Sequence, residues 1–234
     1  MAMETALVAG VGPGLGLALV KAFSQEGYTV LAAARQATSL EGLAESPGSG
    51  RVIPVDCDVT VPAHVDELIK IAEQHGALRV AVFNAGVFKR AEVVETEPAE
   101  FERCWRVGAF GGFLLGRAAA RVMLERGAGT ILFTGATASL RGGAGFANLA
   151  SPKFALRALA QSMARELGPR GIHVAHVIID GQIRSPRYSR PGQEPGSDSL
   201  LEPAAIAETY LALHRQHRSA WTHELDLRPW VEKF

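Results

Sequence analysis

Three glycines near the N-terminus have the spacing of a phosphate-binding turn. Gly10, Gly14 and Gly16 form the pattern GxxxGxG, between the apolar run ALVAG and LALVKAFSQEG, where apolar residues recur at helical spacing. A glycine turn between a strand and a helix brings backbone N–H groups and the positive helix end to a diphosphate. GxGxxG does not fit, because Leu15 stands at its last glycine, and no Lys completes GxxxxGK[ST]. A turn that merely packs helix on strand is the alternative.

Residues after the next two apolar runs indicate which dinucleotide would bind. YTVLAAAR ends in Ala34 and Arg35, and no Asp or Glu follows before Glu41. An acid at this point would bind the ribose 2′-hydroxyl of NAD, whereas an arginine can pair with the 2′-phosphate of NADP. We therefore expect NADP rather than NAD, with a surface arginine that binds no ligand as the alternative. Asp58 and Val59, which end RVIPVDCDV, are placed to hold and flank the adenine, although an Asp there can also simply begin a turn.

Lys153 lies at the head of a predicted amphipathic helix, NLASPKFALRALAQSMARELG, with Leu149 about one turn before it. Its ammonium group can donate three hydrogen bonds. Pro152 suits a first helical turn, where its missing N–H costs nothing. A solvated lysine at a helix start is the alternative.

A frame of alternating strands and helices would bring these residues together. Predicted strands are ALVAG, YTVLAAAR, RVIPVDCDV, RVAVFNAG, GTILFTGA and IHVAHVIIDG. Because they are continuous apolar runs, both faces of the sheet should be covered by helices. We predict one α/β domain over residues 1–234, a Rossmann-like, doubly wound parallel sheet of about seven strands with helices on both faces. Residues 184–200, RSPRYSRPGQEPGSDSL, are predicted to form a mobile loop.

Composition fits a soluble globular chain and disfavours several functions. Hydrophobic residues make up 47% of the 234 residues, and Lys plus Arg, at 24, equal Asp plus Glu, at 24. No net field therefore steers the protein to nucleic acid or a membrane. Cys57 and Cys104 form neither a CxxC pair nor a cluster with His, so we expect no metal site. The N-terminus does not resemble a signal peptide, which favours the cytoplasm.

These motifs in this order, together with the NAG of residues 84–86, resemble the short-chain dehydrogenase/reductase superfamily between Leu7 and about Ser185. The resemblance implies a Rossmann-like domain that binds NAD or NADP, forms a homodimer or homotetramer, and transfers hydride between nicotinamide and a carbonyl or alcohol carbon. Together with the motifs above, it gives the expected cofactor-binding residues: Gly10, Gly14, Leu15, Gly16, Arg35, Asp58, Val59, Asn84, Ala85, Gly86, Lys153, Gly181 and Ile183.

The resemblance breaks at the residues that would move a proton. The family uses a Tyr as proton donor, a Lys that lowers the pKa of this Tyr and holds the nicotinamide ribose, a Ser that binds the substrate oxygen and an Asn that completes a water relay. Matching these motifs retains Lys153 as the Lys, but puts Leu149 at the Tyr, Ala136 at the Ser and Gly108 at the Asn. The 13 residues from Ala136 to Leu149 are the separation that the family gives. Losing a positioned acid costs about 100- to 10,000-fold in rate, so we expect the usual mechanism to be very weak or absent.

Nearby hydroxyls are the candidate replacements. Thr137 and Ser139 follow Ala136 closely, and Tyr188 lies in the predicted loop over the site. His173 and His176 lie three apart on a predicted strand, so they point to opposite faces and are expected to be structural.

Further along the chain, Asp180 stands where the family usually has a Pro before Gly181, which changes the turn near the nicotinamide. The C-terminal aromatic residues Trp221, Trp230 and Phe234 are expected to pack in the core, close a pocket or meet a neighbouring subunit.

Two hypotheses follow. The first is an NADP-dependent oxidoreductase with an altered or relocated proton donor; Phe146 and Leu149 indicate a small, apolar substrate. The second is a nucleotide-binding protein without turnover that acts as a sensor, scaffold or partner subunit. Both predict binding of NADP(H).

Overall fold

A computed structural model describes residues 4–37, 50–186 and 199–231 of the chain. Seven strands form one parallel sheet in the order β3-β2-β1-β4-β5-β6-β9. The strands are β1 (Glu4–Ala9), β2 (Thr29–Ala34), β3 (Val52–Asp56), β4 (Ala77–Phe83), β5 (Gly129–Thr134), β6 (Ile172–Ile179) and β9 (Glu224–Leu227). The order reverses between β1 and β4, which is where an open parallel sheet places its ligand crevice.

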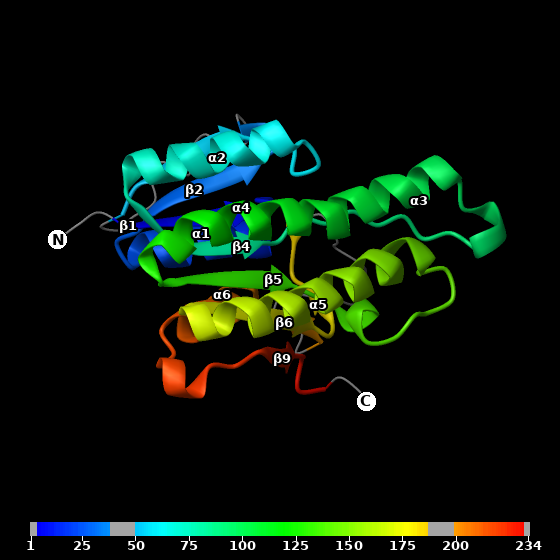
Figure 1. Ribbon diagram of the computed structural model, residues 1–234. Helices are drawn as coiled ribbons and strands as arrows, with labels where there is room; N and C mark the ends of the chain where they lie inside the picture. The colour runs from blue at the N-terminus through cyan, green and yellow to red at the C-terminus, as the bar shows by residue number, and fades with distance from the viewer. Residues whose placement is uncertain (1–3, 38–49, 187–198, 232–234) are drawn as a thin grey trace.

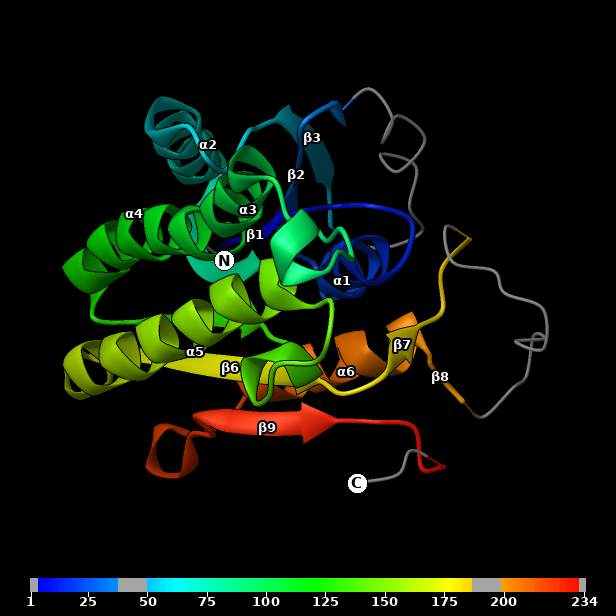
Figure 2. The same ribbon diagram turned by 90° about the vertical axis from the view of Figure 1, so that its right-hand side faces the viewer.

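Helices cover both faces of this sheet. In Figure 2, α2 (Pro62–His75), α4 (Gly111–Arg126) and α5 (Ala147–Leu167) lie on one side, and α1 (Leu15–Gln25) and α6 (Pro203–His214) on the other. Two clusters of buried apolar residues fill the two spaces between sheet and helices. The predicted fold class is therefore confirmed, and the ELDL of the C-terminal stretch supplies the seventh strand.

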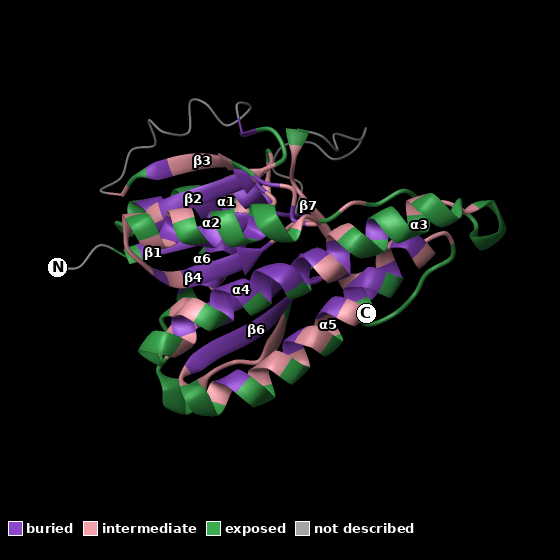
Figure 3. Ribbon diagram, turned by 45° about the horizontal axis from the view of Figure 1, so that its top comes forward, coloured by how far each residue is buried: buried purple, intermediate pink, exposed green. Residues whose placement is uncertain are grey.

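Burial follows the apolar runs that predicted the strands. β6 is buried along its whole length, as a strand covered on both faces must be. Figure 3 shows buried residues along the strands and on the inner sides of the helices, with exposed residues on the outer sides.

α3 (Pro98–Trp105), a π-helix (Arg106–Phe110) and α4 form one continuous helical segment, which projects beyond the sheet at its α3 end (Figure 1). By length and composition alone, Pro98–Arg126 could span a membrane, but 61% of its most apolar window is buried within the fold. This burial is typical of a core helix in a folded domain.

Pro152 lies one helical turn later than the sequence predicts. α5 begins at Ala147, so Pro152 lies in its second turn rather than its first, and its missing N–H removes one helical hydrogen bond.

The predicted loop at 184–200 includes residues 187–198, which lie outside the described residues. At its ends, β7 (Gln182–Ile183) pairs with β8 (Leu200–Leu201) in a separate two-stranded sheet.

Candidate active site

The glycine turn after β1 is held tightly at two of its glycines. Gly10 has a φ of 95°, and a Cβ there would lie 2.4 Å from the backbone nitrogen of Ala85. A Cβ on Gly16 would lie 2.7 Å from the Gly10 carbonyl oxygen, which also accepts a hydrogen bond of 2.9 Å from the Asn84 side-chain nitrogen. The ends of β1 and β4 and the start of α1 therefore close against one another with no room for a side chain.

The outer surface of the same turn is open. A Cβ on Gly12 would meet no atom within 4 Å, and one on Gly14 would make only ordinary contacts, with Ser185 at 3.5 Å and the Arg184 carbonyl oxygen at 3.8 Å. The start of α1 lies directly behind these two residues, so its positive end faces this open surface. The turn therefore leaves space for an anionic group beside backbone that favours negative charge.

Two cavities adjoin the turn and contain the predicted cofactor residues. A cavity of about 660 Å³ is lined by Gly10, Gly14, Leu15, Gly16, Asn84, Gly181 and Ile183, among others. A second, of about 210 Å³, is lined by Arg35, Asp58, Val59, Asn84, Ala85 and Gly86, among others. Every predicted cofactor-binding residue except Lys153 therefore lines one of these two cavities.

Charge at the smaller cavity comes from Arg35 and Asp58. Arg35 is exposed at the end of β2. Burial opposes ionisation of Asp58, but its pKa is nevertheless lowered, because Thr60 donates to it from its backbone nitrogen at 2.9 Å and its hydroxyl at 2.7 Å, and Arg35 lies nearby. This end of the cleft thus offers one exposed cation and one fixed carboxylate.

Lys153 is buried beneath the cleft. Its Nζ donates a hydrogen bond of 2.6 Å to the carbonyl oxygen of Thr134, the last residue of β5, and its side chain is 7% exposed. Burial lowers its pKa to about 8. Lys153 is therefore not the solvated lysine that was the alternative, and it ties α5 to the sheet.

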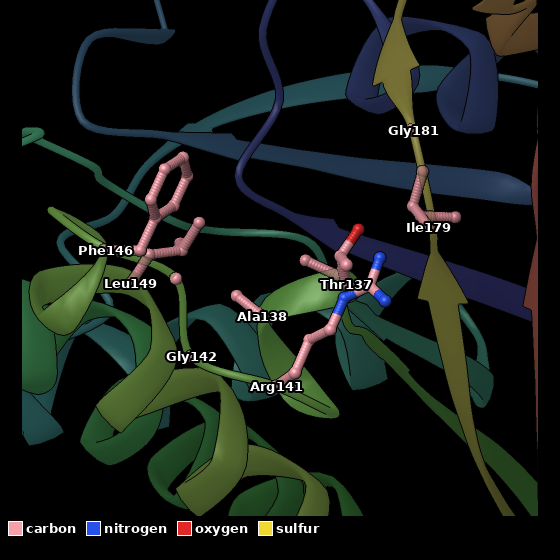
Figure 4. A pocket seen from close by; sticks show the side chains of 10 residues that line it. Thr137, Ala138, Arg141, Gly142, Phe146, Leu149, Ile179 and Gly181 are labelled. Atoms are coloured by element: carbon pink, nitrogen blue, oxygen red, sulfur yellow. The ribbon is translucent and has the colours of Figure 1, made fainter. Parts of the chain in front are cut away.

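The two positions that the sequence predicts for the family's Ser and Tyr meet in one pocket. Ala136 and Leu149 both line a cavity of about 380 Å³ with mostly apolar or small residues, and Figure 4 shows Leu149 and Phe146 on one side of it, opposite Thr137 and Ile179. Tertiary structure thus brings Ala136 and Leu149 together, and neither side chain carries a proton to donate.

The space beside Gly108, the position that the sequence predicts for the family's Asn, is occupied by Pro152. Gly108 lies in the π-helix, and a Cβ there would lie 2.9 Å from the Cβ of Pro152. Pro152 therefore occupies space that a longer side chain at position 108 would need. Sequence reasoning noted the missing asparagine, but it did not connect Gly108 with a proline 44 residues later.

The candidate hydroxyls differ in their surroundings. Thr137 lines the pocket, and its Oγ1 donates to Asp180 Oδ1 at 2.5 Å. Ser139 is fully buried behind it, where its hydroxyl accepts from the Ala136 backbone nitrogen at 3.1 Å and lies 3.4 Å from His176 Nε2. Because Ser139 is buried outside the pocket, Thr137 is the one candidate replacement hydroxyl near Ala136 that lines it. Tyr188 lies outside the described residues.

The other two tyrosines have partners away from the pocket. Tyr28 Oη lies 2.8 Å from His214 Nε2, and Tyr210 Oη lies 2.8 Å from Thr134 Oγ1. Tyr210 is fully buried, and burial raises its pKa well above 10. Both hydroxyls therefore serve the packing of α1 and α6 against the sheet.

A buried polar network that the sequence did not predict lies under the site. His176 Nδ1 is 3.0 Å from Glu224 Oε2, and Arg157 donates two hydrogen bonds of 2.7 Å to the same carboxylate. Burial lowers the pKa of His176 to about 4, so this histidine is neutral at physiological pH. In the sequence, only Glu224, a charged residue in the last strand, indicates such a network. Which residues Glu224 pairs with depends on the strand order.

His173 has a structural role on the other face of β6. Its ring stacks on that of Trp221 with centroids 4.9 Å apart, and its Nε2 lies 2.8 Å from the Thr222 carbonyl oxygen. Both β6 histidines thus hold the C-terminal segment in place. Of the other C-terminal aromatic residues, Trp230 is 81% exposed and Phe234 lies outside the described residues.

An open parallel sheet with a glycine turn and a two-part cleft at its switch point defines a dinucleotide-binding protein of the Rossmann type. Residues 4–187 match the family model of short chain dehydrogenases, and the chain therefore belongs to that family.

Known proteins agree with this assignment. A crystal structure of a short-chain dehydrogenase from Rhodopseudomonas palustris has a TM-score of 0.85 and 41% identity, covering 97% of this chain and 99% of that one. An alcohol dehydrogenase from the archaeon Thermococcus sibiricus, complexed with 5-hydroxy-NADP, has a TM-score of 0.85 and 26% identity, covering 99% and 98%. An uncharacterized oxidoreductase of Staphylococcus aureus is 27% identical over 230 residues, 97% of each chain.

Proposed function

We propose that this chain is an NADP(H)-dependent oxidoreductase that acts on the carbonyl or alcohol group of a small, apolar molecule. One observation carries the proposal: the larger nucleotide cleft and the apolar pocket share three wall residues, Phe146, Leu149 and Gly181. A ligand in the pocket would therefore lie against a nucleotide in the cleft. A protein that only stored nucleotide would not need this adjoining pocket.

The residues present fit NADP. The open faces of Gly12 and Gly14 accept a diphosphate beside the N-terminus of α1, and exposed Arg35 can pair with a 2′-phosphate. Asp58 and Val59 line the part of the cleft that would take the adenine. The solved alcohol dehydrogenase complexed with 5-hydroxy-NADP supports this choice of nucleotide. When bound, the nicotinamide supplies or accepts hydride.

Lys153 would hold the nicotinamide ribose. An ammonium group has three donors, and the Thr134 carbonyl oxygen takes one of them. This role does not need a tyrosine, which explains why a lysine is compatible with Leu149 one turn before it. The buried position fixes the Nζ at the carboxyl end of β5, next to the pocket.

The alternative is a nucleotide-binding protein without turnover, acting as a sensor, scaffold or partner subunit. Leu149, Ala136 and Gly108 favour it, because none of these side chains moves a proton, and Pro152 crowds the third position. The two functions differ in what happens after the nucleotide binds.

Calorimetry followed by a turnover assay separates them. We expect NADP(H) to bind more tightly than NAD(H), and bound NADP(H) to be consumed or formed with a panel of apolar alcohols, aldehydes and ketones. Binding without turnover on the whole panel would favour the non-catalytic function. If neither dinucleotide binds, both proposals fail.

A homo-oligomer is the assembly we propose. Phe101, Trp105, Phe113 and Phe154 on α3, α4 and α5 are each between 38% and 43% exposed. Burying such side chains against a second copy would be favourable. Light scattering in solution tests this, and a monomer at all concentrations would contradict it. We propose a cytoplasmic location, without nucleic-acid or membrane partners.

A further inference from the structure

Two polar residues, Thr137 and Asp180, lie against each other at the pocket. Thr137 follows Ala136, and Asp180 stands at the usual proline position before Gly181; their side chains are 43 residues apart in sequence and 2.5 Å apart in space. Asp180 is 8% exposed, whereas Thr137 and Gly181 both line the pocket. The carboxylate therefore lies behind the Thr137 hydroxyl as seen from the pocket.

This arrangement fixes which way the Thr137 hydroxyl points. An ionised carboxylate only accepts hydrogen bonds, so Thr137 must donate its single proton to Asp180. The remaining capacity of Thr137 Oγ1 is that of an acceptor. Among the described residues that line the pocket, Thr137 has the only side-chain hydroxyl. Its oxygen can accept from the O–H of an alcohol but cannot donate to the oxygen of a ketone.

The charges around Asp180 hold it in place. On the far side, a nitrogen of Arg228 lies 3.5 Å from Asp180 Oδ2, and the same guanidinium pairs with Asp226 at 2.5 Å. The Asp180 backbone nitrogen donates to the Leu227 carbonyl oxygen at 2.8 Å. The segment after β9 therefore compensates the carboxylate charge and fixes its direction toward Thr137.

Other charged groups face this region from the remaining elements. Lys153 of α5 is directed to Thr134, and His176 of β6 is directed to Glu224. Arg141, exposed at the pocket, is the charged donor that could compete for a carbonyl oxygen, and Figure 4 shows its guanidinium beside Thr137. An Arg141 variant therefore separates hydrogen bonds that Arg141 donates to a ligand from those that Thr137 accepts.

We infer that Thr137 and Asp180 form a hydroxyl-binding and proton-accepting pair, which makes an apolar alcohol the substrate that the pocket recognises. The inference rests on the proposed function. The alcohol O–H bond breaks as its proton passes to Thr137 Oγ1, while the proton of Thr137 passes to Asp180 and then to water. The C–H bond of the same carbon releases hydride with its electron pair to oxidised NADP, and the C=O bond forms.

Ligand binding without turnover tests the recognition step. Both probes are measured on the protein saturated with NADP⁺: 1-methylcyclohexanol, a tertiary alcohol that has no hydrogen to lose from its carbinol carbon, and cyclohexanone, which oxidised cofactor cannot reduce. We expect the alcohol to bind about fivefold more tightly, the value of one ordinary hydrogen bond. Equal binding, tighter ketone binding or no binding of the alcohol would overturn the inference.

Variants assign the preference to the pair. Thr137→Val should remove the alcohol preference and Thr137→Ser should keep it, whereas Thr209→Val, the same change at a half-buried position of α6, is the control. In Asp180→Asn the side-chain amide can donate to Thr137, which frees the threonine proton for the pocket, so ketone affinity should rise about fivefold. Arg141→Gln should change both affinities alike.

Rates provide an independent readout. Asp180→Asn should slow oxidation of cyclohexanol about 100-fold, while NADP⁺ affinity stays as it is. An unchanged rate would contradict proton acceptance by Asp180. NADP⁺ affinity is measured for every variant. If no protein binds nucleotide, the proposed function fails. If nucleotide binds but the Thr137→Val protein still prefers the alcohol, only this inference fails.

Discussion

A Cβ on Gly108 would lie 2.9 Å from the Cβ of Pro152. Gly108 lies in the π-helix and Pro152 in α5, and sequence matching puts Gly108 at the Asn of the family's relay. A longer side chain at position 108 therefore needs a change at Pro152, so an asparagine there cannot be introduced alone.

Restoring the usual acid should need fewer changes than restoring the relay. Ala136→Ser with Leu149→Tyr places two hydroxyls in the existing pocket and should raise carbonyl reduction with NADPH about 100-fold over the unchanged chain. Adding Gly108→Asn should destabilise the protein by about 1–3 kcal/mol through overpacking, and Pro152→Gly, which removes the Cβ that crowds this position, should recover part of that loss. Thermal unfolding and NADPH absorbance measure the two effects. A stable Gly108→Asn variant with Pro152 unchanged would contradict this.

Gly10 should tolerate no side chain. Gly10→Ala forces an L-residue to a φ of 95° and places its Cβ 2.4 Å from the Ala85 nitrogen, so we expect a loss of stability of about 2 kcal/mol or more. Gly12→Ala, whose Cβ meets no atom within 4 Å, is the matched control and should keep the unfolding midpoint. Denaturant titration gives both values; equal midpoints would show that the turn can rearrange.

Arg35 should decide between the two dinucleotides. Arg35→Ala should weaken NADP binding about 10- to 100-fold, which is the contribution of hydrogen bonds between an arginine and a phosphate, and leave NAD binding unchanged. Arg117→Ala, an exposed arginine of α4, serves as the control. Calorimetry with each nucleotide provides the comparison. Equal losses for NADP and NAD would mean that Arg35 does not contact the 2′-phosphate.

The buried histidine under the site should make stability depend on pH. The pKa of His176 is lowered from its usual 6.5 to about 4, mainly by burial, so between these values the unfolded chain binds more protons than the folded one. Stability is therefore fully present above about pH 6.5 and falls toward pH 4, with a slope of roughly 1.4 kcal/mol per pH unit for one proton.

His176→Asn should reduce this slope over the same pH window. His214, whose pKa burial also lowers to about 4, should maintain part of it. Urea unfolding at a series of pH values measures the variant and the unchanged protein. An identical slope in His176→Asn would contradict a neutral, buried His176.

The sequence by itself determined the fold class, the glycine turn and the family. These features depend on local order: apolar runs that cover both faces of each strand, glycines at fixed spacing, and a lysine four residues after a position that carries Leu149. Ala136 and Leu149 could be matched to the family's Ser and Tyr for the same reason, since motif spacing along the chain does not depend on packing.

Tertiary structure decided which side chains meet. Sequence spacing gave Thr137 and Ser139 similar standing, but packing buries Ser139 beside His176 and leaves Thr137 in the pocket against Asp180. The same holds for Lys153, which is buried rather than solvated. Parallel strands bring their carboxyl ends to one edge whatever lies between them in sequence, so contacts there depend on strand order and on burial, which local patterns do not encode.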